Sequence, residues 1–138
     1  MTERSWTGRQ QSKPLTPWHE AVRSANLSRV LELLESGSDI NALDERGQTA
    51  LMNAVIWKNL ELAELLIKRG ADLNRTAKLR LSALYLAVIR NEPIFLKLLL
   101  DAGADAALTG STEQYSCTPQ EYAQRHGKKE LVEILGGS

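Results

Sequence analysis

The chain repeats itself about every 33 residues, and no other feature of the sequence restricts its fold as strongly. A threonine or serine recurs at spacings of 33, 33 and 36 residues, at Thr16, Thr49, Ser82 and Thr118. An alanine follows each of them at the same offset, at Ala21, Ala54, Ala87 and Ala123. A glycine followed after one residue by aspartate recurs at Gly37, Gly70 and Gly103. These landmarks predict a tandem array of small units rather than one mixed core.

Each unit has the pattern of two helices and a turn. Thr16 offers a hydroxyl to the free N–H groups of a first helical turn, and Pro17 suits the first helical position. An amphipathic helix follows, with apolar residues at helical spacing: Leu27, Val30, Leu31 and Leu34. Gly37 is placed to end that helix in a left-handed conformation, and Asp44–Gly47 reads as a polar turn.

These motifs resemble those of the ankyrin repeat. The family's Thr-Pro-Leu-His-x-Ala is matched by Thr16-Pro-Trp-His19-x-Ala21 and by Thr118-Pro-Gln-Glu121-x-Ala123, and more weakly by the units that begin at Thr49 and Ser82. Its Gly-Ala-Asp-Val-Asn is matched by Gly37-Ser-Asp-Ile-Asn41 and Gly70-Ala-Asp-Leu-Asn74. Two kinds of family glycine are replaced. Ala25, Lys58 and Asn91 stand between the paired helices, and Arg80 stands where the first unit has the finger glycine Gly47.

The resemblance implies an all-α fold of four helix-turn-helix units with projecting finger loops. We expect an ankyrin-repeat domain over 15–135, with units at 16–48, 49–81, 82–117 and 118–135. A flexible segment, 1–14, precedes the domain and a tail, 136–138, follows it. The three extra residues of the third unit fall in its finger, between Leu108 and Cys117.

Composition argues against several kinds of partner and location. Lys plus Arg equals Asp plus Glu, at 17 each, so no net charge attracts nucleic acid or an acidic membrane. The first residues contain no apolar run of the kind that a signal peptide has, and no stretch is long enough to span a membrane. A single cysteine, Cys117, suits a reducing compartment. We therefore expect a cytoplasmic monomer that binds neither nucleic acid nor membrane.

The sequence carries no constellation that predicts catalysis. His19 falls at the family's structural histidine, and no second His or Cys stands at metal-ligand spacing from it. Cys117 has no histidine at a defined offset that would activate it as a nucleophile. No glycine-rich phosphate loop follows a strand. We expect no enzyme activity, no metal and no cofactor.

The positions that do not repeat point to a contact surface. At helix positions expected on the concave side, the two central units carry apolar residues where the outer units are mostly polar. Large exposed apolar patches mark contact sites, and Trp and Arg often anchor interfaces. The candidate partner-binding residues are Ile56, Trp57, Leu86 and Ile89, with Leu81 from the second finger and Arg46, Arg80 and Arg90 at the rim. In the alternatives, these apolar side chains pack into the stack, or the N-terminal segment covers them through Trp6.

These expectations together predict a non-catalytic module that binds a partner protein on its concave face. Charge differs between neighbouring units: Asp44 and Glu45 lie in one finger, and Arg75, Lys78 and Arg80 in the next. Such patches could orient a partner or neutralise each other. The alternative function is that of an inhibitor or immunity-type protein that blocks the active site of a toxin or enzyme.

Overall fold

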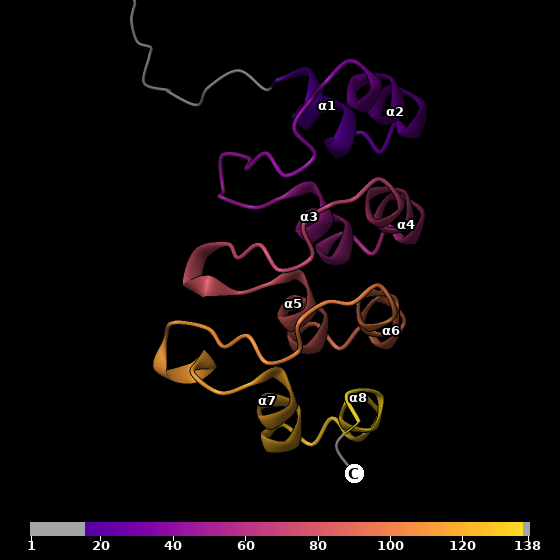
Figure 1. Ribbon diagram of the computed structural model, residues 1–138. Coiled ribbons are helices and arrows are strands. Elements are labelled where there is room, and N and C mark those ends of the chain that lie inside the picture. Colours follow the sequence, from indigo (N-terminus) through magenta and orange to yellow (C-terminus); the bar gives the residue numbers. More distant parts are fainter. Residues whose placement is uncertain (1–15, 137–138) are drawn as a thin grey trace, which may run out of the picture. The chain divides into compact units, whose positions relative to one another are not determined.

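The computed structural model describes residues 16–136, which contain eight α-helices and two short 3-10 turns (Figure 1). They form two compact units, one ending at Ser38 and the other beginning at Asp39. The predicted segment 1–14 lies outside the described residues, as do the last two residues of the predicted tail. The all-α fold of helix-turn-helix repeats is confirmed. No helix in the described part is both long and apolar enough to cross a membrane.

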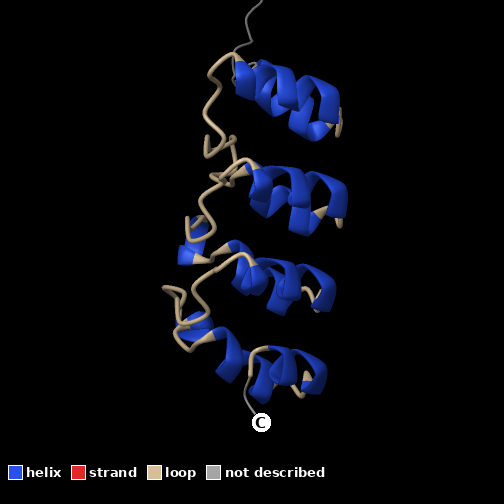
Figure 2. Cartoon of the chain, turned by 45° about the vertical axis from the view of Figure 1, so that its right-hand side comes forward, coloured by secondary structure: helices blue, strands red, loops and turns tan. Residues whose placement is uncertain are grey.

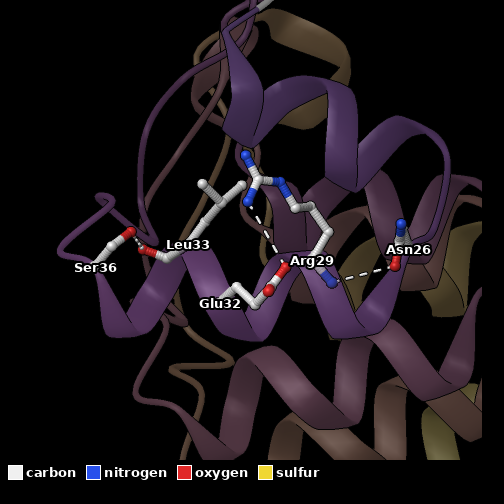
Figure 3. Close-up of polar contacts among 5 residues, drawn as sticks. All are labelled: Asn26, Arg29, Glu32, Leu33 and Ser36. Atoms are coloured by element: carbon white, nitrogen blue, oxygen red, sulfur yellow. Dashed lines mark hydrogen bonds and ion pairs between the residues drawn. The ribbon is translucent and has the colours of Figure 1, made fainter.

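The first compact unit is one helix pair, α1 (Pro17–Arg23) and α2 (Leu27–Glu35). Thr16 caps α1 as predicted, because its side chain accepts the His19 N–H. Asn26 caps α2 through the Arg29 N–H, 3.1 Å away, and Arg29 lies 3.7 Å from Glu32 one turn on (Figure 3). The two caps mark where α1 and α2 begin. The two helices pack together, and their buried apolar residues are Trp18, Ala21, Val22, Val30 and Leu33.

The second compact unit holds three further helix pairs. They are α3 (Ala50–Ile56) with α4 (Leu60–Lys68), α5 (Ala83–Ile89) with α6 (Pro93–Asp101), and α7 (Pro119–Arg125) with α8 (Lys129–Ile134). The first helices of the pairs (the inner helices) form a continuous row, in which α5 packs against both α3 and α7. The second helices (the outer helices) lie beside them, as the separate blue pairs of Figure 2 show. Each pair buries its apolar face on the next, which is how a solenoid builds its core.

The repeated hydroxyl residues begin the inner helices of this unit. Thr49 accepts the Met52 N–H and Ser82 accepts the Tyr85 N–H. Thr118 and Glu121 form a reciprocal capping box at α7. The side chains below 2% exposure include Leu51, Met52, Leu62, Leu66, Leu84, Tyr85, Leu96, Leu99 and Leu131.

The helix ends confirm the predicted left-handed positions. Gly37, Gly70 and Gly103 have φ angles of +101°, +88° and +99°. The residues that replace the glycine between paired helices are also left-handed: Ala25, Lys58 and Asn91 have φ of 57°, 59° and 58°. The backbone therefore keeps the turn although the residue has changed, and a side chain with a Cβ atom is strained there.

Asparagine side chains connect successive loops of the second unit. The Asp72 N–H donates to Asn41 Oδ1 at 2.8 Å, and the Asp105 N–H donates to Asn74 Oδ1 at the same distance. Each aspartate in turn accepts a backbone N–H two residues ahead of it. The repeated Gly-x-Asp-x-Asn sequence thus fixes the spacing of consecutive repeats.

Candidate functional site

The apolar candidates lie at the C-terminal ends of two neighbouring helices. Ile56 ends α3 and Ile89 ends α5, and Leu86 lies one turn before Ile89. All three are half-buried. Trp57 is the C-cap of α3 and Arg90 is the C-cap of α5. Because α3 packs directly against α5, these equivalent positions follow one another along the row of inner helices.

Trp57 is 39% exposed, so its indole is not sealed inside the helix stack. Its backbone N–H is satisfied by the Asn53 carbonyl at 2.8 Å, and the side chain is therefore not needed to end the helix. Trp18, by contrast, is 4% exposed and belongs to the core. An indole that stays partly in water is available to another molecule.

The finger candidates divide into surface and core. Arg46 and Arg80 are exposed. Leu81 is only 7% exposed, which corrects its assignment to the contact surface. It directly precedes Ser82, the N-cap of α5, and burying its large apolar side chain there is more favourable than leaving it in water. Leu79, two residues earlier, is 45% exposed and presents the apolar surface that Leu81 does not.

Asp44 holds the first finger in shape. One carboxylate oxygen accepts the N–H groups of Arg46, at 2.8 Å, and Gln48, at 3.0 Å. The other accepts Nδ2 of Asn53 in α3, at 2.9 Å. Arg46 is thereby presented from a loop that is tied to the helix beside it. The carboxylate has a structural use in addition to the charge that the sequence analysis assigned to it.

An aromatic cluster of the second compact unit joins α5, the third finger and α7. The rings of Tyr85, Tyr115 and Tyr122 lie 5.8 to 5.9 Å apart, and His126 lies 4.2 Å from Tyr122. Burial raises the pKa of Tyr85 well above its ordinary value, and the hydrogen bond to Cys117 raises it further. Burial also raises the pKa of Tyr122. Both phenols are therefore neutral groups that order the cluster.

A hollow of about 650 Å³ opens beside this cluster. Its lining comes from the second finger, the third finger and the end of α7: Leu79, Thr112, Glu113, Gln114, Tyr115 and Arg125. Sequence reasoning placed neither Tyr115 nor Arg125 in a site. The available signal was the three-residue insertion in the third finger, which contains the 3-10 turn Glu113–Tyr115.

The described residues provide little for metal chemistry. Among residues 16–136, no three His, Cys, Asp or Glu side chains are grouped so that they could hold a metal ion. Cys117 is buried and unbridged, and its Sγ lies 3.4 Å from the Tyr85 hydroxyl. The exposed features of these surfaces are instead aromatic, aliphatic and guanidinium groups, which are typical of protein interfaces.

Comparisons with known proteins identify the repeats. The family profile described as ankyrin repeats (3 copies) matches residues 5–77, more than half of the chain. The chain is similar in structure to the ankyrin repeat domain of Bcl-3, described as a unique member of the IkappaB protein family. The TM-score is 0.80 at 32% identity, over 89% of this chain and 52% of that one. The chain thus spans about half the length of that domain. No curated protein sequence matches it.

Proposed function

The chain belongs to the ankyrin-repeat family, whose repeats are protein–protein interaction modules, and on this premise we propose that it binds a partner protein at the C-terminal ends of α3 and α5. The observation that carries the proposal is the exposure of Trp57, at 39%. Tryptophan is the residue type that most often anchors an interface, because it combines a large apolar area with a polar N–H. A partner that covers Trp57 removes this area from water.

The surroundings of Trp57 suit such an anchor. Ile56, Leu86 and Ile89 are half-buried and supply an apolar floor at the ends of α3 and α5. Exposed arginines supply the rim: Arg46, Arg80 and Arg90. An apolar centre within a polar border is the usual anatomy of a protein interface. A contact of ordinary size, about 800 Å² on this side, fits a chain of this length.

The role of binding is non-catalytic in this proposal, and the chain acts as a cytoplasmic monomer. A buried, free Cys117 supports a reducing compartment. In the narrower alternative, the partner is a toxin or enzyme whose active site the repeats cover. That alternative requires the partner to lose its activity in the complex, which an assay of the captured partner would test.

The proposal is tested by Trp57→Ala beside the matched control Ile94→Ala. Ile94 is 61% exposed and lies on α6, an outer helix. Both variants should melt like the wild type, since neither side chain is core. In affinity capture from the source cells, Ile94→Ala should retain the partner and Trp57→Ala should lose it. Equal capture by the two variants would refute the proposed surface.

The stability of Trp57→Ala tests whether the side chain is exposed or belongs to the core. Truncating a buried tryptophan costs about 3 to 5 kcal/mol, so a loss of this size would place Trp57 in the core and contradict the proposal. Trp18→Ala provides the reference, because Trp18 is 4% exposed. We expect Trp18→Ala alone to show such a loss in urea denaturation.

A further inference from the structure

The tip of the second finger holds two consecutive non-glycine residues in the left-handed conformation. Leu79 has φ 65° and ψ 13°, and Arg80 has φ 57°. The equivalent of Arg80 in the first finger is Gly47, which adopts φ 76° without the steric cost of a Cβ atom. Strained backbone of this kind persists only where the surrounding structure holds it, and it gathers at functional sites.

The neighbouring finger holds this tip in place. The Leu79 carbonyl accepts the Ser111 N–H at 2.8 Å. Within the second finger, the Arg80 N–H donates to the Ala77 carbonyl at 3.0 Å, and the Ala77 N–H donates to the Leu81 carbonyl at 2.9 Å. The backbone of Leu79 is thus fixed from both sides while its side chain remains 45% exposed. The two fingers lie on the same side of α5 and α7 (Figure 1).

The chemistry of the hollow between these fingers is apolar in part and basic at its border. Leu79 and the half-buried ring of Tyr115 supply apolar surface, and the exposed Arg125 lines the same hollow. Arg80 adjoins Leu79, and between Leu73 and Leu81 the finger contains basic residues but no acidic one. Glu113 is the one carboxylate in the lining. This distribution complements a ligand that carries an apolar side chain beside negative charge.

We propose that the hollow between the second and third fingers is a further contact site, which receives an apolar side chain flanked by carboxylates in an extended acidic segment of a partner protein. This rests on the proposed function and adds the chemical class of the partner. The apolar side chain packs between Leu79 and Tyr115. The carboxylates pair with Arg80 and Arg125, whose planar guanidinium groups can each hold a carboxylate through two hydrogen bonds.

The test uses the full chain and random peptides displayed on phage. Selected peptides should be acidic, with an aliphatic or aromatic residue between the acids. A synthetic peptide of the selected sequence should bind in a fluorescence anisotropy titration, more weakly as salt is raised. Enrichment of neutral or basic peptides, or no enrichment, would overturn the proposal. Tighter binding of a labelled single-stranded oligonucleotide than of the acidic peptide would also overturn it, in favour of nucleic acid.

Variants then assign the binding to the hollow. Leu79→Gly removes the side chain and at the same time relieves the left-handed strain, so the variant should fold. Leu79→Gly should weaken binding of the selected peptide about tenfold, and so should Arg125→Ala. Glu113→Gln should strengthen binding, because it removes the opposing charge. The control Arg69→Ala, at the exposed C-cap of α4, should change nothing. Unchanged binding to Leu79→Gly and Arg125→Ala would refute the site.

Capture of the native partner by these variants shows which of the two proposals fails. If the captured partner is lost with Trp57→Ala but unaffected by Leu79→Gly and Arg125→Ala, the proposed function stands and the finger site falls. If the finger variants abolish capture and Trp57→Ala does not, the reverse holds. The selected peptide itself should bind Trp57→Ala as it binds the wild type, since the hollow does not include Trp57.

Discussion

The hydroxyl of Tyr85 donates a hydrogen bond to the backbone carbonyl of Cys117 at 2.8 Å, and both residues are buried. Tyr85 stands where the first repeat has His19 and the second has the apolar Met52. The bond joins α5 to the residue that precedes Thr118, the cap of α7. One buried hydroxyl therefore ties the first helix of the third repeat to the last residue of that repeat, directly before the cap of α7.

Tyr85→Phe should destabilise the chain by about 1 kcal/mol, because it keeps the ring but leaves the Cys117 carbonyl without its donor. Urea denaturation followed by far-UV circular dichroism measures the change. Tyr115→Phe is the control, since the described residues include no hydrogen-bond partner for its hydroxyl and its ring contacts with Tyr85 and Tyr122 remain. Equal losses in both variants would show that the Tyr85 bond adds no stability.

The stability of the chain should fall in alkali. Burial and the bond to Cys117 raise the pKa of Tyr85 above its ordinary value, so the folded state retains a proton that the unfolded chain releases near pH 10. This contribution is complete below about pH 10 and is lost as pH rises toward the folded-state pKa, by about 1.4 kcal/mol per pH unit. Tyr85→Phe should flatten the decline in part, because the pKa of Tyr122 is also raised. An unchanged slope would contradict this assignment.

Much of the fold was predictable because the repeated residues have local tasks that their chemistry reveals. Thr16 caps a helix and Gly37 ends one, and neither needs a distant contact to do so. The second finger was not predictable in the same way. Arg80 replaces the glycine that would have indicated a left-handed turn. The backbone of Leu79 is held by a hydrogen bond from Ser111 in the next finger. Such long-range support leaves no periodic signal.

The candidate site was predictable only in part, for a related reason. Helical spacing put Trp57 beside Ile56, but its exposure depends on the packing of neighbouring helices. Leu81 was assigned to the surface because it lies in a finger, and its burial follows from its place just before a helix cap. The hollow lined by Tyr115 and Arg125 arises from the folding of an insertion, whose length was visible but whose shape was not.

Asn74→Ala should weaken one of the two asparagine hydrogen bonds that connect successive loops. The side chain accepts the Asp105 N–H at 2.8 Å, and its loss should cost about 1 kcal/mol or less, since Asn74 and Asp105 are exposed and water replaces the acceptor. Hydrogen exchange of the Asp105 amide should accelerate. The Asp72 amide, which Asn41 holds at 2.8 Å, is the internal control and should exchange as before. Faster exchange at both amides would indicate general loosening of the loops rather than loss of the one Asn74 bond.

Gly110→Ala should separate the second and third fingers. A Cβ atom there would lie 2.5 Å from Cβ of Tyr115 and 3.0 Å from the Leu79 oxygen, so the finger must shift. Overpacking of this kind costs about 1 to 3 kcal/mol. Exchange of the Ser111 amide should accelerate and the melting temperature should fall. Ser111→Ala is the control, because it retains the backbone N–H that bonds Leu79. If Gly110→Ala leaves that amide protected, the fingers are not held by this contact.

Ala25→Gly should stabilise the chain, although glycine usually weakens helical proteins. Ala25 joins α1 to α2 at φ 57°, where a Cβ atom costs about 1 kcal/mol that glycine does not incur. Ala102→Gly is the matched control: Ala102 is also exposed and also follows a helix, but its φ is −83°. The same substitution there should cost about 0.5 to 1 kcal/mol, because glycine gains freedom in the unfolded chain without relief of strain in the folded one. Opposite signs in thermal and urea denaturation are therefore expected, and a loss of stability in both variants would show that the turn at Ala25 carries no strain.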